Sequence, residues 1–287
     1  SVDPMAQAYD NHSPYTYVLN NPINAIDPDG KLIIFVNGFM TDQWLKQDNN
    51  NSFSFSYGYG ALSGQLLNPN YSPYPSERAF SRNAPEYLGK SFEYWGNEKN
   101  VCSGIGGVFS QVYKDYNSLF ISASAGNSSQ AGDRFSEGIT AAKDLIAKLD
   151  NGEISLNDGE TIKIISHSQG AAFAAGMATV LAKDQKYSAV LEAIHYIAPH
   201  QPGDFAHPSN ISGYQWSTKS DWVSSKWTPL MWFNGGSELA KISGIKDENY
   251  HLRESYQGER GGHSVNTYLD AIVDYYRALG ISVTVNE

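Results

Sequence analysis

Apolar and polar positions follow two alternating patterns from Lys31 onward. Runs of consecutive apolar residues are typical of strands that are buried on both faces. Such runs, together with shorter candidate strands, occur at 32–36, 119–123, 161–165, 191–198 and 213–218. Apolar residues at helical spacing occur between and after them, at 135–149, 168–182 and 265–276. Strands that alternate with helices predict an α/β fold, with a mostly parallel sheet and helices on both faces.

One long segment interrupts this alternation. Residues 47–76 are rich in Asn, Ser, Gly, Tyr and Pro, and 47–117 is a possible irregular, aromatic-rich cap or insertion. Inside it, aromatic residues alternate with serine or glycine over 53–59, which predicts a strand or ribbon with one aromatic face.

Composition narrows the function classes. Hydrophobic residues make up 41% of the 287 residues, which is enough for a sizeable core, and the 13% of aromatic residues argues against disorder. The net charge of −10 disfavours a nucleic-acid binder. The single cysteine, Cys102, excludes an internal disulfide framework and a cysteine-rich zinc site. The longest apolar run, 170–182, is too short to cross a bilayer, and no signal peptide opens the fragment.

The first thirty residues have a different character, rich in Pro, Asn, Asp and Tyr. They carry Asp3-Pro4-Met5-Ala6, then Ser13-Pro14-Tyr15-Thr16-Tyr17-Val18-Leu19-Asn20-Asn21-Pro22, and then Ile23-Asn24-Ala25-Ile26-Asp27-Pro28-Asp29-Gly30. This series resembles the end of the core of RHS-repeat (YD-repeat) proteins, including the P-x-x-x-x-D-P-x-G boundary pattern. The resemblance implies a division into an RHS tail at 1–30 and an effector domain at 31–287.

The RHS resemblance implies a biological setting. In that family a large β-cocoon shell ends at this boundary, and a variable C-terminal effector follows, often a toxin with a cognate immunity protein. The resemblance therefore implies a secreted or delivered bacterial effector. Some family members cleave themselves near the boundary with paired aspartates, which makes Asp27 and Asp29 candidates for processing. The alternative is a Pro/Asp/Gly turn without chemistry.

The segment with the most chemical information is 161–172, which is predicted to form a strand, a tight turn and a helix. Its turn, Ser166-His167-Ser168-Gln169-Gly170, resembles the G-x-S-x-G nucleophile elbow of lipase-like α/β-hydrolases, with Ser166 in place of the first glycine. Small residues after the serine let strand and helix approach, and the Ser168 hydroxyl would project at a helix N-terminus. The alternative is that Ser168 caps the helix.

The remaining catalytic residues are candidates by this resemblance, in which the chain order is Ser, acid, His. His263 follows two glycines and precedes the last predicted helix, so it is the candidate general base, whereas His167 is expected to pack at the elbow. Asp221 follows a predicted strand, two strands past the elbow, and Asp204 is its rival as the acid. The backbone amides of Gln169 and Phe39, with Met40 as second choice to Phe39, are the candidate oxyanion hole. Asn37 could pin the latter loop through its amide.

Tryptophan and histidine residues elsewhere in the sequence are candidates for binding. Four of the six tryptophans lie within 216–232, and these and the 53–59 aromatics either line an acyl-chain cleft, meet a membrane interface or pack in the core. His195, His200 and His207 lack a recognised metal-ligand spacing, so neither a metal nor another cofactor is expected.

These observations predict a serine ester hydrolase of the lipase or phospholipase type, with Ser168, His263 and Asp221 as catalytic residues. The RHS resemblance makes membrane phospholipid the favoured substrate and implies an immunity protein as partner. A peptidase, amidase or thioesterase on the same fold, and a non-enzymatic binding or structural tip, remain alternatives. A nuclease is disfavoured by the acidic charge.

Overall fold

The protein is described from a computed structural model. The described residues are 32–38, 55–59 (backbone only), 94–95, 104–115, 117–123 (backbone only at 117 and 122), 130–154, 156, 159–221, 223–224, 240–254 and 261–285. The predicted RHS tail at 1–30, including Asp27 and Asp29, and most of the predicted insertion lie outside these residues.

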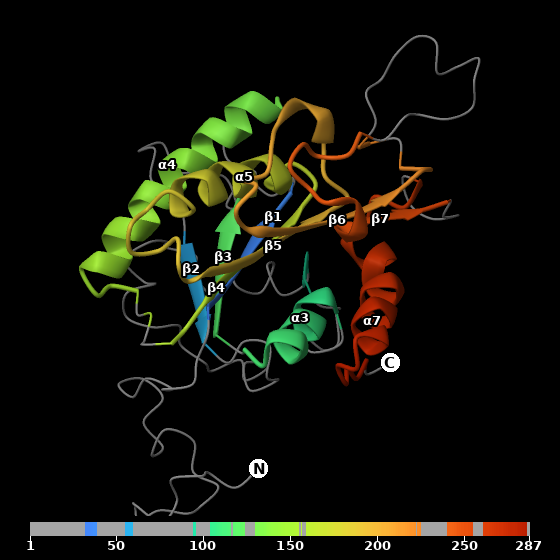
Figure 1. Ribbon diagram of the computed structural model, residues 1–287, viewed down its shortest axis with the longest axis horizontal. Coiled ribbons are helices and arrows are strands. Elements are labelled where there is room, and N and C mark those ends of the chain that lie inside the picture. Colours follow the sequence, from blue (N-terminus) through green and yellow to red (C-terminus); the bar gives the residue numbers. More distant parts are fainter. Residues whose placement is uncertain are drawn as a thin grey trace, which may run out of the picture.

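A twisted sheet of seven strands forms the centre of the molecule (Figure 1). Its strands are β1 (Leu32–Asn37), β2 (Phe55–Tyr59), β3 (Asn117–Ser122), β4 (Ile162–His167), β5 (Leu191–Ile197), β6 (Ser212–Thr218) and β7 (Tyr250–Arg253). The spatial order is β2-β3-β1-β4-β5-β6-β7. Every neighbouring pair is parallel except β2 and β3, so β2 is an antiparallel edge strand.

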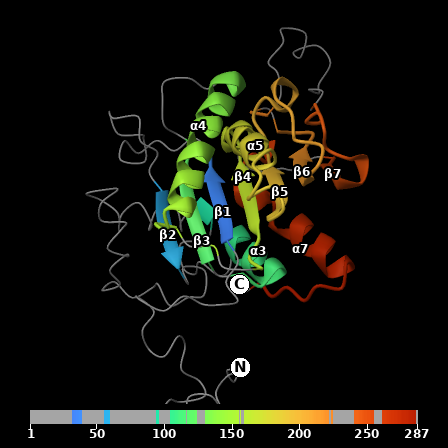
Figure 2. The same ribbon diagram turned by 60° about the vertical axis from the view of Figure 1, so that its left-hand side comes forward.

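Helices cover both faces of the sheet, as Figures 1 and 2 show. On one face lie α4 (Ala131–Asp150) and α5 (Gly170–Leu181), and on the other lie α3 (Ile105–Tyr113) and α7 (Leu269–Ala278). In the described part of the chain, three short 3-10 helices occur in the connections: η7 (Pro202–Asp204), η8 (Asp247–Asn249) and η10 (Val265–Tyr268). The predicted fold class, α/β with a mostly parallel sheet and helices on both faces, is confirmed.

The central strands are apolar throughout because both of their faces are buried. In β1, Leu32, Ile34 and Val36 belong to the core beneath α4 and α5, whereas Ile33 and Phe35 belong to the core beneath α3 and α7. All five side chains are fully buried. The continuous apolar run therefore supplies two separate cores from one strand.

Helix α5, which follows the predicted elbow, is locked against α4 by close backbone contact. A Cβ at Gly138 of α4 would lie 1.9 Å from the Phe173 carbonyl oxygen, and one at Gly176 of α5 would lie 2.1 Å from that of Phe135. Only glycine fits at either position, because a methyl group there would overlap backbone atoms. The predicted apolar run at 170–182 is confirmed as a buried core helix.

Three features differ from the pattern-based expectations. The helix predicted over 265–276 begins with the 3-10 turn η10 before α7. Strand β7 was not predicted, because its four residues, three half-buried and Leu252 exposed, carry no clear periodicity. Within the range 47–117 predicted as a cap or insertion, β2 joins the sheet and α3 packs on its face. Ile105, Val108 and Phe109 of α3 are buried in the core.

Candidate active site

Three side chains from distant parts of the sequence form one hydrogen-bonded chain. The Ser168 Oγ lies 2.8 Å from His263 Nε2, and His263 Nδ1 lies 2.8 Å from Asp221 Oδ2. Ser168, His263 and Asp221 are 6%, 5% and 0% exposed. The structure thus brings together the three residues predicted from sequence as nucleophile, base and acid.

The topology explains why these residues meet. Ser168 directly follows β4, Asp221 follows β6, and His263 lies in the connection between β7 and η10. Because β4 to β7 are neighbouring parallel strands, the segments that follow them leave the same edge of the sheet. Two hydrogen bonds join the acid segment to β7 and to the histidine segment: Lys219 N–H donates to the Arg253 carbonyl at 2.9 Å, and Ser220 Oγ donates to the Gly261 carbonyl at 2.7 Å.

The backbone at Ser168 is strained in the way the elbow interpretation predicts. Its φ is +55°, a left-handed value that is unfavourable for a residue with a side chain. The first turn of α5 passes so close to β1 that a Cβ at Gly170 would lie 2.5 Å from the Val36 carbonyl oxygen. Ser166, which replaces the usual glycine, fits because its buried hydroxyl donates to the His195 carbonyl of the neighbouring strand at 2.7 Å.

Hydrogen bonds around Asp221 fix the proton arrangement of the three residues. Its Oδ1 accepts the backbone N–H groups of Val223 and Ser224 at 3.0 and 3.1 Å, and its Oδ2 accepts the Ser224 hydroxyl at 2.6 Å. With an ionised Asp221, His263 Nδ1 must carry the proton that it shares with Oδ2. The neutral ring then presents the Nε2 lone pair to the Ser168 hydroxyl, which is the orientation of a general base.

The rival acid, Asp204, is exposed in η7. The carboxylate that the structure joins to His263 is that of Asp221.

No protein-family model matches the chain, and no curated protein matches its sequence. The chemical interpretation of the site therefore rests on its own geometry.

The predicted oxyanion hole is only partly described. Gln169 follows the nucleophile at the N-terminus of α5, and no described group accepts a hydrogen bond from its backbone N–H. This position, directly after the nucleophile, is where one of the two oxyanion donors is predicted. Phe39 and Met40 lie outside the described residues. Asn37 was predicted to pin this loop through its side-chain amide. That amide donates a hydrogen bond to the Gly38 carbonyl at 3.1 Å.

Several residues that bear on the site were not predicted. The Ser224 hydroxyl donates to the acid, next to the Asx turn that the Val223 N–H forms with the Asp221 carboxylate. His200 N–H donates to the Ser168 carbonyl at 3.0 Å, and its Nδ1–H donates to the Val223 carbonyl at 2.9 Å. His200 thereby ties the nucleophile segment to the acid segment. Burial lowers its pKa, so its ring stays neutral around pH 7.

The histidines named above as possible metal ligands form hydrogen bonds with hydroxyl and carbonyl groups of the protein. His195 Nε2 lies 2.6 Å from the Tyr113 hydroxyl, and its ring stacks on Tyr214 with centroids 4.6 Å apart. His207 lies 2.9 Å from both the Tyr196 hydroxyl and the Ile211 carbonyl. Within the described ranges, no group of three or more His, Cys, Asp or Glu side chains is arranged to hold a metal ion.

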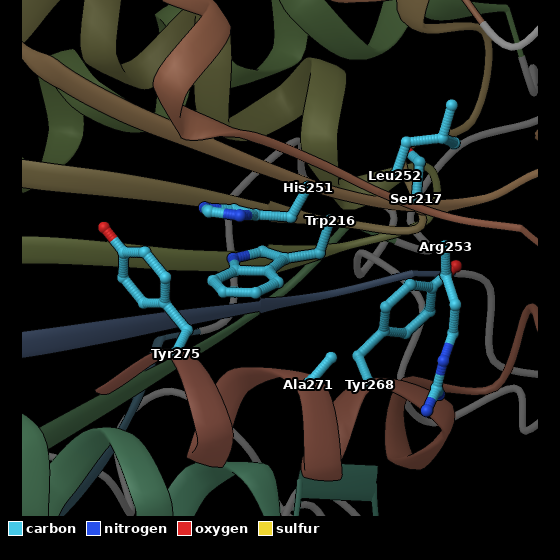
Figure 3. A pocket seen from close by; sticks show the side chains of 8 residues that line it. All are labelled: Trp216, Ser217, His251, Leu252, Arg253, Tyr268, Ala271 and Tyr275. Atoms are coloured by element: carbon cyan, nitrogen blue, oxygen red, sulfur yellow. The ribbon is translucent and has the colours of Figure 1, made fainter. Parts of the chain in front are cut away.

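Trp216, a candidate for an acyl-chain cleft, is instead part of the core. It is 2% exposed, and its ring stacks on His251 with centroids 4.0 Å apart. Both rings line a pocket of about 370 Å³ between β6, β7 and α7, with Tyr275 on one side and Tyr268 on the other (Figure 3). None of Ser168, Asp221 and His263 lines this pocket. The other three tryptophans of 216–232 lie outside the described residues.

A helix that spans a membrane must be both long and apolar, and this requirement can be applied to the described helices. None of them combines the length and the apolar character that crossing a bilayer requires.

Proposed function

We propose that the protein is a serine ester hydrolase that uses Ser168 as its nucleophile, His263 as its general base and Asp221 as the residue that orients the base. The observation that carries the proposal is the unbroken chain of two 2.8 Å contacts from Ser168 through His263 to Asp221. A serine hydroxyl is a weak nucleophile at neutral pH and needs such a base. A serine that only capped α5 would need neither the histidine nor the carboxylate.

The proposed reaction has two halves. The Ser168 Oγ attacks the ester carbonyl while its proton passes to His263 Nε2, and the Gln169 N–H together with the Phe39 N–H stabilises the oxyanion. Collapse of the tetrahedral intermediate breaks the bond to the alcohol, which receives the proton from His263. Water, deprotonated by His263, then attacks the acyl-enzyme and releases the acid, and Ser168 recovers its proton.

The order of elements supports a lipase-like α/β-hydrolase. The serine, acid and histidine follow β4, β6 and β7 in that chain order, and the serine occupies a left-handed turn between strand and helix. The same order occurs in the α/β-hydrolases that the elbow motif resembles. This order supports hydrolysis by a serine nucleophile with a histidine base. Esterases and amidases share such residues, so the order supports both classes equally.

The substrate proposal rests on the sequence alone. The resemblance of residues 1–30 to the end of an RHS core favours a delivered antibacterial effector whose ester is membrane phospholipid. A cognate immunity protein is then the expected partner.

Hydrolysis of matched substrates tests the function. We expect the protein to cleave fluorogenic acyl esters and phospholipid vesicles, and to cleave anilides of the same acyl groups at least about 100-fold more slowly. The Ser168→Ala variant controls for contaminating hydrolases and should show only background cleavage. Cleavage of anilides or peptides in preference to esters would favour an amidase or peptidase, and failure to cleave any substrate would favour a non-enzymatic tip.

A further inference from the structure

A second hydrogen-bonded chain runs beside Ser168 through Tyr94 and His167, which have no role in the proposed reaction, and ends at the backbone of His263. The Gly38 N–H donates to the Tyr94 hydroxyl at 2.9 Å, and that hydroxyl makes a short contact with His167 Nδ1. His167 Nε2 lies 2.7 Å from the backbone carbonyl oxygen of His263. The chain thus links the loop after β1 to the segment that carries the proposed base.

The direction of each hydrogen bond follows from the acceptor at its end. The His263 carbonyl can only accept, so His167 Nε2 carries a proton. Burial, aided by the neighbouring His263, lowers the pKa of His167 to about 3, so the ring is neutral and its Nδ1 is an acceptor. Tyr94 must therefore donate its hydroxyl proton to His167 while its oxygen accepts the Gly38 N–H. No proton in this chain has an alternative position at neutral pH.

The residues of this chain also touch the nucleophile and the base sterically. A Cβ at Gly38 would lie 2.6 Å from Ser168 Cβ and 2.9 Å from the Tyr94 hydroxyl oxygen. The His167 ring packs against the rings of Tyr94 and His263, with centroids 5.5 and 5.2 Å away. A small movement of His167 would therefore displace the His263 segment and the Gly38 loop together.

We propose that His167 and Tyr94 are positioning residues that hold the His263 segment and the Gly38 loop at fixed places beside Ser168. This inference rests on the proposed function. It also assigns the Gly38 N–H to Tyr94, so an oxyanion donor from this loop must come from a later residue, as predicted for Phe39.

Two substitutions of His167 separate the two ends of the chain. In His167→Gln, the side-chain amide can reach the position of Nε2 and donate to the His263 carbonyl. In His167→Asn, the shorter side chain can occupy the position of Nδ1 and meet Tyr94, but it cannot reach His263. We expect kcat for ester hydrolysis to fall about 10- to 100-fold in His167→Asn and less than about fivefold in His167→Gln, with KM nearly unchanged in both.

Two tyrosine variants complete the test. Tyr94→Phe removes the central hydroxyl and should lower kcat about 10-fold. Tyr196→Phe is the matched control, because it removes a buried hydroxyl from another histidine, His207, in the core on the α4 and α5 side. It is expected to lower the thermal midpoint but to change kcat less than about twofold.

The outcomes distinguish this inference from the proposed function. If the wild-type protein hydrolyses esters but His167→Asn, His167→Gln and Tyr94→Phe all behave like Tyr196→Phe, the positioning role is overturned and the function stands. If kcat follows thermal stability across all four variants, the chain is only structural and the positioning role is again overturned. If the wild-type protein does not hydrolyse esters, both proposals fail together.

Discussion

Replacement of Asp221 by asparagine is expected to lower kcat for ester hydrolysis by about four orders of magnitude while the protein remains folded. The reason lies in the partners of the two carboxylate oxygens. Oδ1 accepts two backbone N–H groups, so an asparagine would keep its carbonyl oxygen there. Its NH₂ group would then face His263 Nδ1 and would require a lone pair on that nitrogen. The proton would move to Nε2, and His263 could no longer accept the Ser168 proton.

Asp204→Asn is the matched control for this experiment, because Asp204 is the other aspartate proposed as the acid from sequence. We expect its kcat to stay within about twofold of wild type. The measurement is steady-state hydrolysis of one fluorogenic ester by the wild type and both variants, with circular dichroism as the check on folding. Asp221 would lose its assigned role if Asp221→Asn kept more than about a tenth of wild-type kcat.

The free energy of unfolding is expected to fall steeply as the pH drops below about 6.5. Burial lowers the pKa values of His167 and His195 to about 3. In the unfolded chain both rings return to an ordinary value near 6.5. Between these values the unfolded state binds protons that the folded state does not, so the stabilisation is complete above pH 6.5 and is lost toward pH 3. Each histidine contributes a slope of about 1.4 kcal/mol per pH unit.

Together the two rings would remove about 5 kcal/mol over two pH units, which is comparable to the total stability of many domains. Burial also lowers the pKa values of three other histidines, His200, His207 and His251. These residues therefore also make the free energy of unfolding fall as the pH falls. Urea unfolding at about pH 7.5, 6 and 5 measures the slope. His195→Phe should reduce the slope by about 1.4 kcal/mol per pH unit. An unchanged slope in this variant would show that His195 does not contribute as described.

The fold and the nucleophile, Ser168, could be predicted because their signals are local. A run such as 161–165 needs only its own residues to identify a strand, and the small residues after Ser168 identify the turn that follows. The positions of Asp221 and His263 were carried by the resemblance to α/β-hydrolases, because no local pattern distinguishes Asp221 from Asp204. The hydrogen bond to His263 distinguishes them.

The parts that could not be predicted depend on contacts between distant residues. Strand β7 pairs with β6 through its backbone, and a backbone ladder leaves little trace in four side chains. Tyr94 reaches His167 from 73 positions away in the chain. His167 was expected only to pack at the elbow, since its hydrogen bond to the His263 carbonyl has no sequence signature.

Covalent modification of Ser168 tests the central claim most directly. The claim is that His263 activates this one hydroxyl as a nucleophile. We expect a fluorophosphonate reagent to add a single adduct to the wild-type protein, located on Ser168 by peptide mass spectrometry, and to react at least about 1,000-fold more slowly with His263→Ala, which keeps the serine. An unmodified wild-type protein, an adduct on another residue, or equal rates for the two proteins would contradict the account.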